Sequence, residues 1–221
     1  ETQSTTRQIG IRQRSLRRHC RLGRATELVF VLATGVTLTM SGAATAQTWD
    51  GGADPDNSFI EGTNWDGDVA PAPVGAAVID GAGGANQPTV NVGDAPTVAT
   101  AAISGGTLTI IGTLTATTGV TISDTGTVLV SAGTGALIAD TEITEGGLLS
   151  VGGVVTGNID NGGITPGGLD ITSTGLVTGN VTSSGNGSNA GVTAVTTGID
   201  GDLEVTDGTF DNAGIVTGNT S

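Results

Sequence analysis

The segment Gly105-Gly-Thr-Leu-Thr-Ile110 decides the fold, because close variants of its last four residues return along the chain. In each variant Leu, Val or Ile alternates with a second residue, and a Gly precedes the run. The variants are Thr127-Val-Leu-Val130, Gly147-Leu-Leu-Ser-Val151 and Gly168-Leu-Asp-Ile171, which follow one another at intervals of 20 to 21 residues. Self-similarity at this period predicts a repeat architecture.

A second motif supports the same period. Three nearly identical copies are Val154-Val-Thr-Gly-Asn158, Leu176-Val-Thr-Gly-Asn180 and Ile215-Val-Thr-Gly-Asn219. Their spacings are 22 and 39 residues, and 39 is close to two periods. We interpret each copy as a short strand that ends in a Gly-Asn corner.

Residues 97–221 therefore predict an all-β fold, a right-handed parallel β-helix (β-solenoid) with coils of about 20 residues. Thr, Val and Ile favour pleated strands, whereas the frequent Gly disfavours helix. We expect Gly and Asn to supply positive-φ corners, and Thr and Asn to form stacked hydrogen-bonded ladders. At ~4.8 Å per coil there is room for about six coils. A leucine-rich repeat is an alternative at this period, but the sequence lacks the Leu-x-x-Leu-x-Leu pattern of that fold. Disorder is the other alternative.

The charge distribution divides the chain. All seven basic residues lie between Arg7 and Arg24, and 19 of the 21 acidic residues lie from Gln47 onward. Residues 1–46 are predicted to be a signal peptide, with a basic n-region and an apolar h-region at 28–40 (Leu28 to Met40). Thirteen helical residues span roughly 20 Å, too short for a permanent anchor across ~30 Å of hydrocarbon.

Signal-peptide cleavage is expected before Gln47, because Ala44 and Ala46 are the small residues that a signal peptidase accepts. The alternative is an amphipathic N-terminal helix of a cytosolic protein. Residues 47–96 are predicted to form an N-terminal head that contains both tryptophans, Trp49 and Trp65. These rings are predicted to cap the open end of the solenoid, and contact with a glycan is the alternative.

The head and the repeats carry a resemblance. Thr48-Trp-Asp-Gly-Gly52, Asn64-Trp-Asp-Gly-Asp68, Val69-Ala-Pro71 and Ala77-Val-Ile-Asp80 lead into Gly-Thr-Leu repeats. This order resembles the start of autotransporter-type passengers and related secreted bacterial β-repeat proteins. The resemblance implies a surface protein of a Gram-negative bacterium, with a downstream membrane barrel or anchor. The chain ends inside a repeat and does not begin with Met, so we expect an N-terminal fragment.

From Gln47 onward the sequence contains no Lys, Arg, His, Cys or Tyr. This composition excludes Ser-His and Cys-His nucleophiles, Schiff-base lysines and imidazole metal sites. Carboxylate pairs for glycoside hydrolysis are the remaining catalytic option, and the candidates are Asp140 with Glu142, and Asp200, Asp202 and Glu204. Aromatic platforms for sugars are scarce, so we expect a protein that is not an enzyme.

Calcium is the ligand that the oxygen-rich turns favour, although none of them matches an EF-hand or the Gly-Gly-x-Gly-x-Asp repeat. The weak candidate ligands are Asp54, Asp56, Asp66, Asp68, Asp200 and Asp202. Uniform negative charge argues against nucleic acid and against insertion into an anionic membrane.

Three functions follow, in order of preference. The first is a secreted or cell-surface structural stalk, adhesin-like and non-catalytic, whose partner is an unknown surface ligand or glycan. The second is a calcium-stabilised secreted scaffold. The third is a carbohydrate-active β-helix enzyme.

Overall fold

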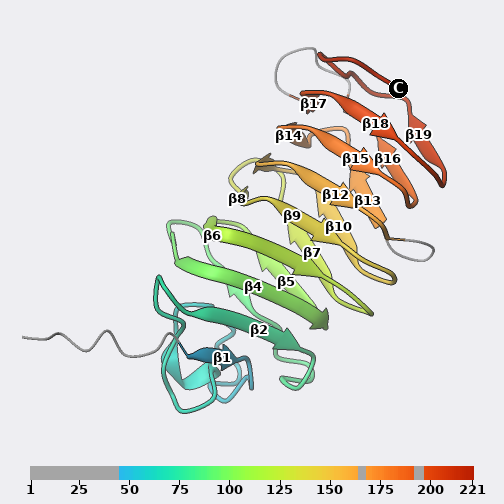
Figure 1. Cartoon of the computed structure of the whole chain (residues 1–221). Helices are drawn as coiled ribbons and strands as arrows, with labels where there is room; N and C mark the ends of the chain where they lie inside the picture. The colour runs from blue at the N-terminus through green and yellow to red at the C-terminus, as the bar shows by residue number, and fades with distance from the viewer. Residues whose placement is uncertain (1–44, 164–167, 192–196) are drawn as a thin grey trace, which may run out of the picture. The chain divides into compact units, whose positions relative to one another are not determined.

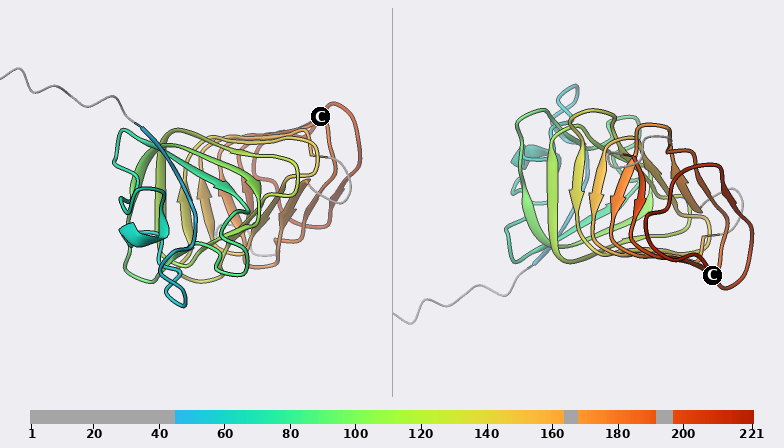
Figure 2. Two further views of the ribbon diagram at one scale, coloured as in Figure 1. Left: turned by 90° about the horizontal axis from the view of Figure 1, so that it is seen from below. Right: turned by 90° about the horizontal axis from the view of Figure 1, so that it is seen from above.

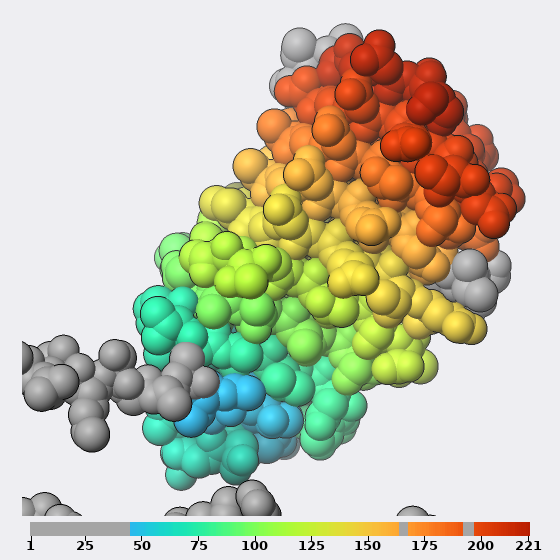
Figure 3. Space-filling model, in the orientation of Figure 1, coloured from blue at the N-terminus to red at the C-terminus, as the bar shows by residue number. Residues whose placement is uncertain are grey.

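Parallel β-strands stack coil upon coil in a computed structural model of the chain (Figure 1). The structure describes residues 45–163, 168–191 and 197–221. The predicted all-β parallel solenoid is confirmed, with about six coils of ~21 residues. Figure 2 shows the same stack from below and from above, with the coils following one another from the N-terminal to the C-terminal end, and in Figure 3 they appear as successive bands of colour.

Two sheets run the length of the stack. The first has twelve strands: β1 (Ala46–Thr48), β2 (Ala76–Asp80), β4 (Thr97–Gly105), β6 (Thr113–Ile122), β8 (Ala136–Ile138), β9 (Thr141–Ile143), β11 (Val154–Thr156), β12 (Ile159–Asn161), β14 (Leu176–Thr178), β15 (Val181–Ser183), β17 (Gly198–Asp200) and β18 (Leu203–Val205). The second has seven: β3 (Thr89–Val90), β5 (Thr107–Ile110), β7 (Thr127–Val130), β10 (Leu148–Val151), β13 (Gly168–Ile171), β16 (Gly187–Asn189) and β19 (Phe210–Asn212). One short 3-10 turn, η1 (Gly62–Asn64), lies in the described part of the head.

The motif that predicted the fold builds the second sheet. Thr107 pairs with Thr127, Thr127 with Leu148, and Leu148 with Gly168, all in parallel register. The interval of 20 or 21 residues is therefore the length of one coil. The stacking of these segments was predicted from the sequence and is confirmed.

The second motif lies in the first sheet, where its first two copies form the predicted short strands and its third copy forms a single bridge. Val154 pairs with Leu176, and each strand ends immediately before its Gly-Asn pair. The third copy lies two coils further on, because Val216 bridges to Ile199 and Ile199 pairs with Val177. The intervening coil carries Gly198-Ile-Asp-Gly-Asp202 at the same place, which explains the spacing of 39 residues.

The number of strands per coil changes along the stack. β4 and β6 run straight through nine and ten residues. From β8 onward the same path is split into two three-residue strands. A corner, first formed by Ala139 and Asp140, separates the halves. The later coils thus have three short strands each, whereas the coils of β4 and β6 have one long strand and one short strand.

Alternate side chains of each strand point into the stack and form columns. One column runs Leu108, Val128, Leu149, Leu169, and all four side chains are buried. The matching column of the first sheet runs Leu114, Leu137, Val155, Val177, Ile199. Each fully buried aliphatic side chain stabilises the fold by about 1.5–3 kcal/mol, and a single coil cannot bury its own columns.

The corners correct one expectation about Asn. Gly157 and Gly179 have φ of +140° and +146°, and Asn158 and Asn180, which follow them, are not in the positive-φ region. A Cβ at Gly157 would overlap the carbonyl oxygen of Ala139 in the preceding coil. Glycine therefore supplies the conformation and the close approach between coils, and asparagine contributes its side chain instead.

The strand pairing of the sheets begins within residues 47–96. β1 pairs in parallel with β2, and β2 pairs with β4. β3 pairs with β5 in the second sheet. The head therefore contributes paired strands to both sheets, in addition to its loops.

Candidate functional site

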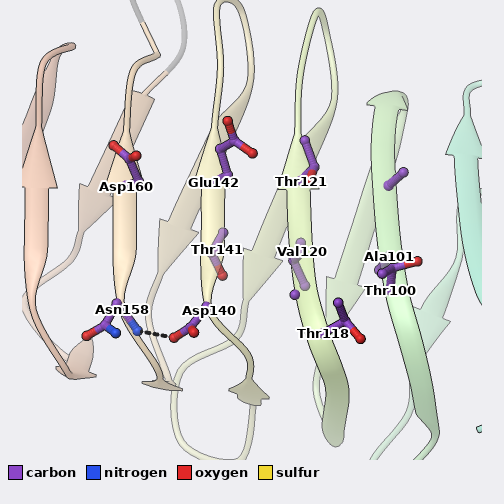
Figure 4. A pocket seen from close by; sticks show the side chains of 12 residues that line it. Thr100, Ala101, Thr118, Val120, Thr121, Asp140, Thr141, Glu142, Asn158 and Asp160 are labelled. Atoms are coloured by element: carbon purple, nitrogen blue, oxygen red, sulfur yellow. Dashed lines mark hydrogen bonds between the residues drawn. The ribbon is translucent and has the colours of Figure 1, made fainter.

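A groove of about 750 Å3 crosses the outer surface of the first sheet. Four successive coils form its walls (Figure 4). They contribute parts of β4, β6, β9 and β12, together with the corners that precede β9 and β12. The lining residues include Thr100, Ala102, Thr118, Thr121, Asp140, Glu142, Asn158 and Asp160. The groove therefore contains one of the two carboxylate clusters predicted from the sequence.

One row of outward side chains crosses the groove. Strand pairing places Ala102 beside Thr121, Thr121 beside Glu142, and Glu142 beside Asp160. Glu142 and Asp160 are both exposed and have no hydrogen-bond partner among the described residues. Neighbouring strands lie ~4.8 Å apart, so two like charges in this arrangement repel by about 1 kcal/mol in a water-like dielectric.

A second row runs along the corners. Thr100 pairs with Gly119, and the next two coils place Asp140 and Asn158 at the same position. The backbone N–H of Asn158 donates to Oδ1 of Asp140 at 2.8 Å, as the dashed line in Figure 4 shows. One oxygen of Asp140 thus accepts a hydrogen bond that joins two coils, whereas the carboxylate of Glu142 has no such role among the described residues.

The corner hydrogen bond repeats through the rest of the stack. Oδ1 of Asn158 accepts from the N–H of Asn180, Oδ1 of Asn180 from Asp202, and Oδ1 of Asp202 from Asn219, at 2.7 to 3.0 Å. The predicted ladder of stacked Asn side chains is present, with Asp at two of its five positions. Each bond joins a side chain to the backbone of the next coil, so the ladder sets the spacing of the corners.

The second predicted carboxylate cluster occupies the equivalent place in a later coil. Asp202 belongs to the corner ladder, as Asp140 does. Glu204 lies beside Thr182, in the row that contains Glu142. Oδ1 of Asp200 accepts from the hydroxyl of Thr217 at 2.7 Å. Because Glu204 has Thr rather than an acid as its neighbour on β15, this coil lacks the adjacent carboxylates of the groove.

Both head tryptophans are buried, with 1% and 0% of Trp49 and Trp65 exposed. Their rings meet edge to face at 5.2 Å, and Phe59 packs against Trp65 in the same manner at 4.9 Å. Each indole N–H has a backbone acceptor, the carbonyl of Asn86 for Trp49 and that of Phe59 for Trp65. Buried rings offer no face on which a sugar can stack, and this aromatic cluster is a suitable end cap for the first coils.

The six calcium candidates do not come together. Asp54, Asp56, Asp66 and Asp68 lie in the turns of the head, where Oδ1 of Asp56 accepts from the N–H of Ser58. Asp200 and Asp202 lie at the other end of the stack. Within residues 45–163, 168–191 and 197–221, no three His, Cys, Asp or Glu side chains are grouped as a metal site would require. Calcium binding stays a prediction.

The predicted signal falls mostly outside the described residues, which include neither the h-region nor Ala44. Ala46 and Gln47 lie in β1, where they pair with Ala76 and Ala77. Cleavage before Gln47 would therefore shorten β1 by one residue. In the described part of the chain, no helix has the length and apolar character needed to cross a membrane.

Sequence reasoning found Asp140 and Glu142 but missed their neighbours Asn158 and Asp160. The step from Thr141 to Ile159 is 18 residues, whereas the step from Val120 to Thr141 is 21. A fixed period of 20 places Asp160 out of register with Glu142. Aligning the coils on their corners, Asp140 with Asn158, would have brought the two acids side by side.

Comparisons with protein-family models, with curated proteins and with solved structures found no match to this chain.

Proposed function

We propose that residues 1–46 direct export, and that the region from Gln47 onward serves as a non-catalytic structural stalk at the surface of a Gram-negative bacterium. The observation that carries the proposal is the in-register stack of coils, joined by two parallel sheets and a corner ladder. The sequence resemblance to autotransporter-type passengers, together with the basic and apolar N-terminal segment, supports the surface location.

The stack has the properties that a spacer needs. Each coil adds ~4.8 Å, so about six coils extend over roughly 30 Å. Every coil is held to its neighbours by backbone pairing along both sheets. The 19 carboxylates from Gln47 onward keep such a surface soluble and discourage pairing between exposed strand edges.

Export is the part of the proposal that a single experiment tests directly. The full chain with a C-terminal tag would be expressed in a Gram-negative host, and the cell fractions analysed by intact mass. We expect a species outside the cytoplasm that begins at Gln47. A matched variant, Val31→Arg with Leu32→Arg, interrupts the apolar segment and should leave the chain unprocessed in the cytoplasm.

Two results would contradict the proposal. One is that the unmodified chain remains uncleaved in the cytoplasm. The other is that the two-arginine variant is exported and processed as efficiently as the parent, which would show that the apolar segment is not the signal.

A further inference from the structure

The groove over β4, β6, β9 and β12 is hollow because the coils near its start carry small side chains. Gly119 stands in the corner row between Thr100 and Asp140, and it has no side chain. Ala102 stands in the other row beside Thr121 and contributes only a methyl group. The two later coils carry Asp, Glu and Asn at the equivalent places, so the groove has one hydroxyl-bearing wall and one acidic wall.

The acidic wall is not neutralised by its own domain. Asp140, Glu142 and Asp160 contribute three carboxylates. From Gln47 to Ser221 the sequence contains no Lys, Arg or His. Glu142 and Asp160 are direct neighbours across β9 and β12, an arrangement that a strand pair ordinarily avoids. Features that break a local rule without compensation inside the fold are expected at functional sites.

We propose that this groove binds a flexible organic cation with two or more primary ammonium groups, of which a linear polyamine is the simplest example. One ammonium group between Glu142 and Asp160 relieves their mutual repulsion and receives two charge-assisted hydrogen bonds. Further along the groove, the hydroxyls of Thr100, Thr118 and Thr121 accept hydrogen bonds from the second ammonium group.

The shape and the donors favour this class over a bare metal ion. The groove holds about 750 Å3, far more than one ion occupies. No three acidic side chains of the described residues converge closely enough to ligate a metal. The binding site would be an activity additional to the stalk, since a spacer needs no carboxylate pair.

Calorimetric titration of the full chain with spermidine at low ionic strength tests the proposal. Glu142→Gln with Asp160→Asn keeps the shape and removes both charges, and we expect binding to weaken about tenfold or more. The matched control, Glu204→Gln with Asp66→Asn, removes the same charge outside the groove and should bind like the parent. Equal weakening in both variants would overturn the proposal, because it would show diffuse attraction of counterions only.

A second variant does not depend on the loss of charge alone. Thr121→Lys places an ammonium group next to Glu142 in the adjacent strand, and should occupy the site from within the chain. We expect it to abolish spermidine binding and to raise the melting temperature. Retained binding in a folded Thr121→Lys protein would contradict the assignment.

Two parallel titrations distinguish the sources of the cation. A short peptide with two lysines tests whether the ammonium groups of another protein serve as well as a free polyamine. Magnesium tests for simple divalent attraction. Binding of magnesium with the same dependence on Glu142 and Asp160 would overturn the preference for an organic ligand.

Discussion

The early and late coils of the solenoid pair in the same two parallel sheets but differ in what fills the interior. The interior column at the end of the second-sheet strands begins with aliphatic residues, Ile110, Val130, Val151 and Ile171, and then reaches the buried amide of Asn189, which pairs with the exposed Asn212. The equivalent column of the first sheet is apolar at Ile122 and Ile143, becomes polar at Asn161 and Ser183, and is apolar again at the half-buried Val205. The early coils are therefore held by apolar burial, and the late coils depend partly on buried hydrogen bonds.

The apolar columns and the amide columns stabilise the fold in different ways. Apolar burial is non-directional and scales with the area removed from water. A buried amide must instead meet its partners at fixed positions. Nδ2 of Asn161 donates to Oγ of Ser183 and to the carbonyl of Asn186, and Oδ1 of Asn161 accepts from the N–H of Gly163. The difference teaches that apolar columns supply most of the stability, whereas amide ladders fix the register of one coil on the next.

The largest expected effect tests the apolar column. Leu149→Ala removes a fully buried side chain between Val128 and Leu169, and should lower the free energy of unfolding by about 2–5 kcal/mol. Urea unfolding followed by circular dichroism measures the change. The control is Leu129→Ala in the neighbouring strand, whose side chain is 36% exposed and points outward, and for which we expect a much smaller change. Similar losses in both variants would show that the interior column is not the main source of stability.

A smaller and more local effect tests the amide ladder. Asn161→Ala leaves the N–H of Gly163 and the hydroxyl of Ser183 with fewer partners, at a cost of about 1–3 kcal/mol. Because coils contact only their neighbours, hydrogen exchange should accelerate at Ser184 and Gly185, which donate to the carbonyl of Asn161, before it accelerates in β5 or β7.

Asn158→Ala in the same coil is the matched control. Asn158 is exposed and its side chain makes a single hydrogen bond to the backbone of Asn180, so its loss should cost less than the loss of Asn161. If the two variants are equally stable, or if exchange accelerates uniformly along the stack, the buried amide of Asn161 does not hold its coil on the next one as inferred.

Much of the fold could be predicted because one coil is one sequence period. The alternation in 107–110 specifies which side chains face inward, and the repeat of that segment specifies which strands pair. The Gly-Asn pairs marked the corners correctly, although only their glycines have the expected backbone conformation. Their glycines hold the positive φ, and their asparagines bond to the next coil.

The groove was harder to predict because it has no sequence period. Its acidic wall needs Glu142 and Asp160 in adjacent strands, and that depends on a short coil of 18 residues. The split of the first sheet at Asp140 likewise cannot be predicted from any single coil, since β6 continues through the same point as one strand. Pairings of this kind follow from the exact length of each turn, which alternation does not specify.

The smallest expected effect concerns a polar side chain inside an otherwise apolar column. Thr141 stands between Val120 and Ile159, and only 3% of the residue is exposed. Its hydroxyl oxygen has no hydrogen-bond partner among the described residues. Replacement by Val keeps the shape and removes a group that lost its hydration on folding. We expect Thr141→Val to raise the free energy of unfolding by about 1 kcal/mol.

The matched control is Thr156→Val, because Thr156 is exposed on β11 and its hydroxyl can reach water. Its replacement should change the unfolding free energy by less than about 0.5 kcal/mol. Loss of stability in Thr141→Val would mean that the hydroxyl has a partner, such as an enclosed water, and that polar side chains also hold the early coils together. A gain confined to Thr141→Val would instead sharpen the comparison, since it would show that the early columns are stabilised by apolar burial and that the hydroxyl of Thr141 destabilises its column.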